Sequence, residues 1–233
     1  MQVDIWSDVR CPFCYIGKHK FEKALQDFPQ KDKIDIVWHS FELDPYIKTD
    51  PDKSIYEHLA ENKGIPRDQA KQMVEYSTEI AKDAGLKFNQ EKSIVANSFN
   101  AHRLIQFAKT KRLGDKVEEQ LFKSYFEDGK NIDDKATLAQ IGVGIGMDNK
   151  ELEEVLSSDA FGKEVRKDES AAQEIGIHGV PFFIFDQKYA VSGAQPPEVF
   201  SGALAQSWDE YQKKQNLVIL EEGKSCSVGG NCN

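Results

Sequence analysis

The sequence predicts an α/β fold in which both ends of the chain supply strands and the middle supplies only helices. Three observations predict it. Residues 2–43 read as strand, helix, strand. Residues 53–157 contain six helical segments, most of them closed by glycine, and no strand pattern. Residues 177–215 return to two short strands followed by a helix. An all-helical domain is therefore inserted into a mixed one.

The N-terminal unit begins with the apolar strand VDIW, residues 3–6, which ends at a Ser-Asp pair. Over residues 12–27 the apolar positions recur at helical spacing, and Pro29 ends the helix. The segment KIDIVWHSFEL then alternates apolar and polar residues, which is typical of a strand. A strand, helix, strand unit of this length predicts a parallel pair of strands.

The insertion is predicted to cover residues 46–165. Ser54 and Glu57 form a capping box for the helix IYEHLAENK, which Gly64 ends. The other five segments are PRDQAKQMVEYSTEIAKDAG, NSFNAHRLIQFAKTKRLG, DKVEEQLFKSYFEDG, DDKATLAQIG and DNKELEEVLSS.

The last third returns to mixed structure. DAFGKEVRKDESAAQEIG is helical, VPFFIF and YAVSG are strands joined by the turn DQK, and PPEVFSGALAQSWDEYQKK closes the chain as a helix. Residues 1–45 and 166–220 then form one discontinuous domain in the element order of a thioredoxin-like fold. Residues 221–233, EEGKSCSVGGNCN, are predicted to be a flexible tail that carries cysteines.

Composition excludes several classes of partner. The net charge of -9 argues against nucleic acid and against an anionic membrane. No stretch approaches the roughly 18 apolar residues of a membrane span. The N-terminus, MQVDIWSDVRC, has no basic and apolar leader pattern, so we expect a cytoplasmic protein. In a reducing compartment, a closely spaced cysteine pair is more often catalytic or metal-binding than structural.

The pair Cys11 and Cys14 lies where the first strand becomes a helix. A helix that begins at residue 11 or 12 places Cys11 at its N-terminus, where free N–H groups and the helix dipole favour a thiolate. Pro12 suits the first helical turn because its missing N–H costs nothing there. Cys11 is therefore predicted to be the exposed attacking sulfur, and Cys14, one turn further in, the resolving one.

A metal site and incidental packing are the alternatives for this pair. Zinc needs four ligands, so a closed site would have to recruit the distant Cys226 and Cys232. The histidines are scattered and supply no H-x3–5-H pattern. We therefore predict a catalytic dithiol and no metal.

The segment GIHGVPFFIF supplies the second half of such a site. Pro181 stands at the first residue of a strand, where its missing N–H does not break the ladder. A cis Val180-Pro181 bond would turn this loop toward Cys11 and leave backbone groups free to pair with an extended substrate. Val180 and Pro181 are thus the predicted substrate-binding residues, against the alternative of an ordinary strand-start proline.

Four more residues are candidates for a groove over Cys11: Phe13, Asn97, His102 and His178. Phe13 lies between the cysteines, and His178 is three residues before the proline. The alternative for the NSFNAHRL stretch is an N-capping Asn97 followed by a structural or surface His102-Arg103 pair.

The segments SDVRCPFCYIGK, WHSFELDP, NSFNAHRL and GVPFFIF resemble those of the DsbA-like thioredoxin-fold oxidoreductases, in particular the FrnE-like branch. The resemblance implies a thioredoxin domain with a helical insertion and thiol–disulfide oxidoreductase or isomerase activity, with Cys11, Cys14 and Pro181 in the active site. It implies no cofactor beyond the redox-active disulfide. The FrnE-like branch also has a second cysteine pair near its C-terminus, which Cys226 and Cys232 match and which is a candidate electron relay.

Two alternatives to this function stay open. Sister families of the same fold are glutathione-dependent isomerases or transferases, which usually have a serine in place of the first cysteine. Retention of Cys11 and Cys14 favours redox exchange with protein or small-molecule thiols and disulfides, and leaves glutathione as a candidate co-substrate. From a different class, a chaperone-like module could bind partners in the groove between the domains. The sequence assigns no oligomeric state.

Overall fold

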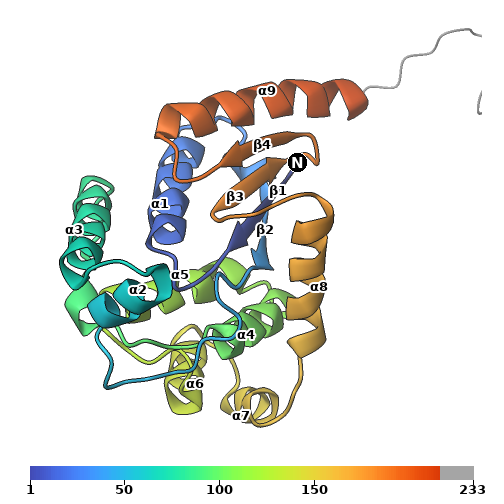
Figure 1. The fold of residues 1–233 in the computed structure, drawn as a ribbon. Helices are drawn as coiled ribbons and strands as arrows, with labels where there is room; N and C mark the ends of the chain where they lie inside the picture. The colour runs from blue at the N-terminus through green and yellow to red at the C-terminus, as the bar shows by residue number, and fades with distance from the viewer. Residues whose placement is uncertain (216–233) are drawn as a thin grey trace, which may run out of the picture.

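The computed structural model describes residues 1–215. A four-stranded sheet in the order β2-β1-β3-β4 forms its centre (Figure 1). The strands are β1 (Gln2–Ser7), β2 (Asp35–Ser40), β3 (Phe182–Phe185) and β4 (Tyr189–Ser192). β1 pairs with β2 in parallel and with β3 antiparallel, and β3 and β4 form a hairpin. The predicted parallel pair and hairpin are both confirmed.

The sheet is covered on both faces, which explains why five of the six residues of strand β1 are buried. Helices α1 (Pro12–Gln26) and α9 (Pro197–Gln215) pack together on one face. There Phe21 of α1 contacts the rings of Phe183 and Phe200, and all three are fully buried. Helix α8 (Gly162–Glu174) covers the other face and packs against β2 (Figure 1).

Six helices fill the chain between β2 and α8, as predicted. They are α2 (Ile55–Lys63), α3 (Arg67–Asp83), α4 (Phe99–Thr110), α5 (Gly114–Phe126), α6 (Lys135–Gly144) and α7 (Asn149–Ser157). The predicted capping box of Ser54 and Glu57 begins α2. The fold is therefore thioredoxin-like with a helical insertion. The boundary predicted between residues 165 and 166 falls inside α8.

The insertion lies at the end of the sheet where β1 runs into α1 (Figure 1). α5 packs against both β2 and α1, and α3 also contacts α1. No helix within residues 1–215 is long and apolar enough to cross a membrane. The predicted tail, with Cys226 and Cys232, lies outside the described residues.

Candidate active site

The two cysteines occupy the first turn of α1. Cys11 is the N-cap residue, and Pro12 follows in the first turn. The backbone N–H of Cys14 donates to the carbonyl of Cys11 at 3.0 Å, which closes this turn around both thiols. Both cysteines are free. Cys11 is only 5% exposed, so it is more enclosed than the sequence predicted, and Cys14 is 1% exposed.

The proline loop lies directly beside Cys11. The Val180-Pro181 bond is cis, which is the isomer that the sequence left open. The thiol of Cys11 donates to the carbonyl oxygen of Val180 at 3.7 Å. The second turn of α1 supports the loop through Gly17, where an added Cβ would lie 2.9 Å from Cγ of Pro181. The two segments that the sequence analysis combined, about 170 residues apart, therefore meet at one place.

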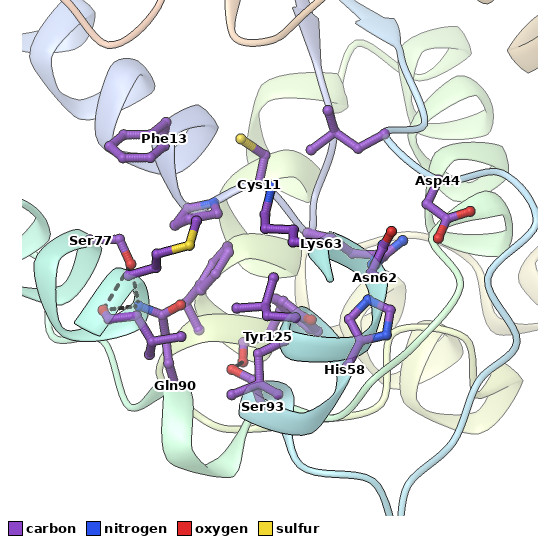
Figure 2. A pocket seen from close by; sticks show the side chains of 18 residues that line it. Cys11, Phe13, Asp44, His58, Asn62, Lys63, Ser77, Gln90, Ser93 and Tyr125 are labelled. Carbon is purple, nitrogen blue, oxygen red and sulfur yellow. Dashed lines mark hydrogen bonds between the residues drawn. The ribbon is translucent and has the colours of Figure 1, made fainter. Parts of the chain in front are cut away.

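A pocket of about 420 Å³ opens beside Cys11, between the first turn of α1 and the insertion (Figure 2). Phe13 lines it together with Cys11, so this predicted groove residue does face the site. The opposite walls come from α2 and α3 and from the end of α5, through residues such as His58, Met73 and Tyr125. Access to Cys11 therefore passes by side chains of the inserted helices.

Cys14 is held as a thiol. Burial raises the pKa of Cys14 well above its usual value, and the neighbouring Cys11 raises it further, while the Ser7 hydroxyl and the Asp8 backbone act in the opposite direction. The hydroxyl of Ser7 in turn donates to Oε1 of Glu118 on α5 at 2.9 Å. Glu118 is 1% exposed, and this burial raises its pKa to about 7. Ser7 thus connects Cys14 to a buried carboxyl of the insertion.

A buried ion pair lies below the first turn of α1. Asp8 accepts hydrogen bonds from the backbone N–H groups of Arg10 at 3.1 Å and Leu43 at 2.9 Å. Its carboxylate also lies 3.6 Å from Nε2 of His102 on α4. Burial opposes the charge on both side chains, yet their mutual interaction lowers the pKa of Asp8 and raises that of His102. His102 therefore belongs to this buried layer and does not line the pocket beside Cys11.

Asn97 and Arg103 hold the insertion together. The amide of Asn97 donates to the carbonyl of Ile47 at 3.1 Å and accepts from the N–H of Phe99 at the start of α4. Arg103 donates to the carbonyls of Ala160 at 2.8 Å and of the last turn of α7. Neither residue lines the pocket beside Cys11, and both have structural roles, although Ser98 and not Asn97 is the N-cap residue of α4.

His178 is also displaced from the pocket beside Cys11. It is exposed, and it borders a separate hollow with Phe41 and Glu42. Nearness to Pro181 along the chain did not bring its side chain to Cys11, because the chain turns at Gly179 before the proline loop.

Sequence reasoning did not single out Ser7, Asp8, Arg10 or Glu118. The first three flank the cysteine motif, and an acidic and a basic residue beside it were an available signal. Glu118 had none, because it is one of two successive glutamates on an amphipathic helix. Only the packing of α5 shows which of the two is buried.

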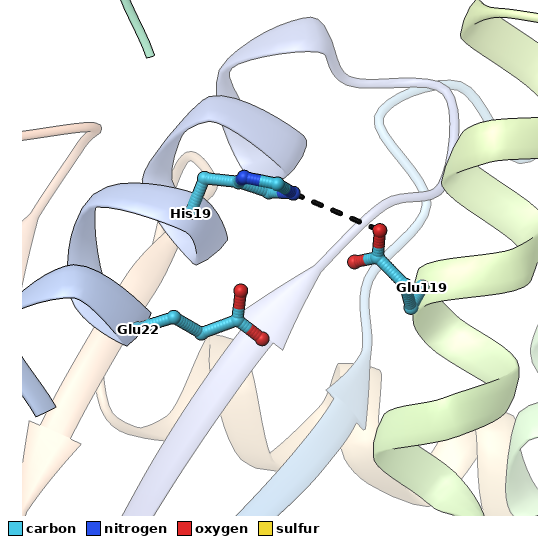
Figure 3. A group of neighbouring side chains, drawn as sticks. All are labelled: His19, Glu22 and Glu119. Carbon is cyan, nitrogen blue, oxygen red and sulfur yellow. Dashed lines mark ion pairs between the residues drawn. The ribbon is translucent and has the colours of Figure 1, made fainter. Parts of the chain in front are cut away.

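One cluster has the geometry of metal ligands: His19, Glu22 and Glu119 lie close together between α1 and α5 (Figure 3). The ammonium of Lys18 already lies among them. It is 2.8 Å from Glu119 and also pairs with Glu22, and Lys18 is 2% exposed. The hydroxyl of Tyr15 donates to Glu119 as well. This cluster is therefore an ion-pair network that joins α1 to the insertion, with its cation supplied by the chain.

Comparison with known proteins agrees with this geometry. A probable DsbA oxidoreductase of Streptomyces coelicolor, SCO1869, is 36% identical, with a TM-score of 0.85 over 100% of this chain and 98% of that one. The uncharacterized protein YwbO of Bacillus subtilis (strain 168) is 26% identical over 92% of this chain and 99% of its own length. The cytosolic disulfide reductase DsbM of Pseudomonas aeruginosa, solved also with GSH, shares the fold at 15% identity, with a TM-score of 0.62 over 93% of this chain and 100% of its own.

The family model for the DSBA-like thioredoxin domain matches residues 2–205. This match includes the whole sheet, the inserted helices and both halves of the site, the cysteine turn and the proline loop. The sequence similarity thus covers most of the chain. It agrees with the geometry of the site, in which a dithiol at a helix N-terminus faces a cis-proline at the start of a strand. The protein belongs to the DSBA-like thioredoxin domain family.

Proposed function

We propose that this protein is a thiol–disulfide oxidoreductase that uses Cys11 as nucleophile and Cys14 as resolving thiol. The observation that carries the proposal is the pair of free thiols in the first turn of α1, with Sγ of Cys11 3.7 Å from the Val180 carbonyl. The Cys11 thiolate attacks a disulfide, forms a mixed disulfide and releases one thiolate. Cys14 then displaces the second thiolate, so two electrons pass from the dithiol to the substrate. The reverse sequence oxidises a substrate dithiol.

The roles of the two sulfurs follow from their surroundings. Cys14 is buried, and its raised pKa keeps it protonated while Cys11 reacts. Cys11 lines the pocket from which a substrate approaches. The backbone of the Val180-Pro181 loop, beside Cys11, is the proposed contact for an extended part of the substrate.

Resolution requires Cys14 to lose its proton inside the protein. We propose that this proton passes through the Ser7 hydroxyl to Glu118. Ser7 already donates to Glu118, and a carboxyl whose pKa is about 7 can accept a proton near neutral pH and release it again.

The test is a pair of single substitutions. Cys11→Ser is expected to abolish disulfide exchange, and Cys14→Ser to accumulate mixed disulfides on Cys11 that mass spectrometry detects without reduction. Full exchange activity in Cys11→Ser would contradict the mechanism. A redox titration of the Cys11–Cys14 pair against glutathione then gives its potential, which distinguishes a reductase from an oxidant or isomerase.

The pocket beside Cys11 favours one second candidate, a glutathione-dependent isomerase or transferase. DsbM, which has the same fold, was solved with GSH, and a volume of about 420 Å³ is large enough for a small thiol. Saturable turnover of a small electrophile that depends on glutathione and survives Cys14→Ser would support it. Under the first proposal glutathione is a redox co-substrate, and turnover requires both cysteines.

The cytosolic description of DsbM also supports the proposed cytoplasmic location.

We also propose that the tail pair, Cys226 and Cys232, exchanges electrons with the active-site dithiol, as the FrnE-like branch assignment implies. Helix α9 begins beside the proline loop, where the N–H of Gly193 donates to the Pro181 carbonyl, and its 19 residues extend away from it for about 28 Å. The 11 residues from 216 to 226 can span up to about 36–40 Å when extended, so chain length permits a return. Unchanged turnover after replacement of both tail cysteines by serine would refute the relay.

A further inference from the structure

The guanidinium of Arg10 lies in the wall of the pocket beside Cys11 and forms no ion pair within residues 1–215, although its charge helps to lower the pKa of Asp8 and its hydrogen bond with Tyr125 counters the burial that raises the pKa of that hydroxyl. Arg10 lines this pocket, and its Nε and Nη1 atoms are buried without a hydrogen-bond partner. Within the described part of the chain, no carboxylate lies within ion-pair distance of this guanidinium. Buried donors without an acceptor are costly, and an arginine fork matches a carboxylate in shape and charge. The geometry therefore calls for an anionic group from a bound molecule.

The acids nearest to Arg10 do not meet this need. Asp8 uses its two oxygens for the N–H groups of Arg10 and Leu43 and faces His102 from 3.6 Å. Asp44, the acidic residue of the pocket lining, accepts a hydrogen bond from the N–H of Tyr46 and forms no ion pair with Arg10. The basic side chains of the lining, His58 and Lys63, offer no negative charge to Arg10.

The remainder of the pocket is mostly apolar. Its walls include six apolar side chains: Pro12, Phe13, Leu59, Met73, Val74 and Phe126. A volume of about 420 Å³ lies in the range of small-molecule sites. Helices α2 and α3 enclose the pocket opposite the cysteine turn, which limits what can reach Cys11 by this route to a small molecule or a single side chain.

We infer that this pocket selects small-molecule disulfides that carry a carboxylate beside a compact apolar body. The carboxylate binds the guanidinium of Arg10, the body packs against Phe13 and Met73, and one sulfur lies at Cys11. This inference rests on the proposed function and names its substrate class. Cys11 forms a disulfide with the near sulfur and releases the far half as a thiolate; Cys14 then releases the near half, so one disulfide becomes two thiols and the protein dithiol becomes a disulfide.

Two aromatic disulfides test the inference because both release a coloured thiol. 5,5′-Dithiobis(2-nitrobenzoate) carries a carboxylate on each ring, and 4,4′-dithiodipyridine carries none. In full-length protein with Cys14, Cys226 and Cys232 replaced by serine, Cys11 is the single remaining thiol of the four cysteines. The readout is the ratio of the two second-order rate constants, since any change in the reactivity of Cys11 itself affects both probes.

Arg10→Gln is expected to lower this ratio by about tenfold or more, with Arg10→Lys between the two, because lysine keeps the charge and loses the fork. The matched control is Lys63→Gln, which removes a positive charge from the exposed edge of the same pocket and is expected to change the ratio less than about threefold. An unchanged ratio in Arg10→Gln, or an equal decrease in Lys63→Gln, overturns the subsite and leaves the thiol chemistry intact. Failure of Cys11 to react with either probe in the parent protein overturns the proposed function as well.

Discussion

The clearest stability prediction concerns Glu118. Its carboxyl is buried away from water, and within residues 1–215 no oppositely charged side chain forms a hydrogen bond with it. It is 1% exposed and accepts the hydroxyl of Ser7. Glu118→Gln keeps the shape and the acceptor oxygen and removes the ionisation. Burial raises the pKa of Glu118 from 4.5 to about 7. Folding therefore favours the protonated form, and stability is lost as the pH rises from the lower value through the higher one.

The size of this loss follows from linkage. With these two pKa values, ionisation of Glu118 costs the folded state about 0.8 kcal/mol at pH 5 and about 3.3 kcal/mol at pH 8. Glu118→Gln escapes this cost. Its free energy of unfolding relative to the unmodified protein should therefore rise by about 2.5 kcal/mol between pH 5 and pH 8. Urea unfolding under reducing conditions, at several pH values in this interval, measures the difference.

The neighbouring Glu119 provides the control. Burial also opposes its charge, but hydrogen bonds and the charge of Lys18 lower the pKa of Glu119 to about 2. Glu119→Gln should therefore destabilise the protein near neutral pH, and this effect should fade as the pH falls below about 4.5. A Glu118→Gln variant whose stability relative to the unmodified protein stays flat from pH 5 to pH 8, as is expected for Glu119→Gln, would refute the assignment of a buried carboxyl with a raised pKa.

Two further substitutions test the packing around the site. Gly17→Ala places a Cβ 2.9 Å from Cγ of Pro181, so we expect a loss of about 1–3 kcal/mol in unfolding free energy and several-fold slower reaction with 4,4′-dithiodipyridine. The control is Gly202→Ala, because Gly202 has open space around it. Equal reaction rates in the two variants would contradict the argument. Asp168→Asn removes a buried carboxylate. Burial opposes its charge, but its hydrogen bond with His39 lowers the pKa of Asp168, so the variant should be less stable by about 1–3 kcal/mol at pH 7. That deficit should shrink below pH 3.8 in acid unfolding, and a deficit independent of pH would show that packing alone is involved.

The positions of the two cysteines and of the proline loop could be predicted from the sequence because their determinants are local. Cys11 and Cys14 fall in the first turn of a helix that Pro12 helps to begin, and Pro181 stands at the first residue of a strand. Each position is defined by its own element, and the order of the elements brings the two together. The cysteine spacing and the two prolines, placed on elements that the hydrophobic pattern predicts, therefore located both halves of the site.

The buried charged residues Asp8, His102 and Glu118 and the lining of the pocket could not be predicted in the same way. Glu118 and Glu119 are successive residues on α5, about 100° apart around the helix, and only the packing of α5 buries the first and exposes part of the second. His102 was one of the candidates for the groove, with a structural role as the alternative, and its side chain faces the buried Asp8. Side-chain direction on an inserted helix depends on how that helix docks, which the local sequence does not encode.

The residues that could be predicted and those that could not come from different parts of the chain. Contacts that fix the sulfur atoms, from Cys11 to Val180 and from Gly17 to Pro181, lie within the thioredoxin-like part of the chain. Contacts that a small substrate would meet come largely from α2, α3 and α5. Because Cys11 is only 5% exposed, a molecule that enters by the pocket must fit between these inserted helices before it reaches Cys11. Changes in the pocket lining of α2 and α3 can therefore alter which molecules reach Cys11, while the separation of Cys11 from the proline loop stays the same.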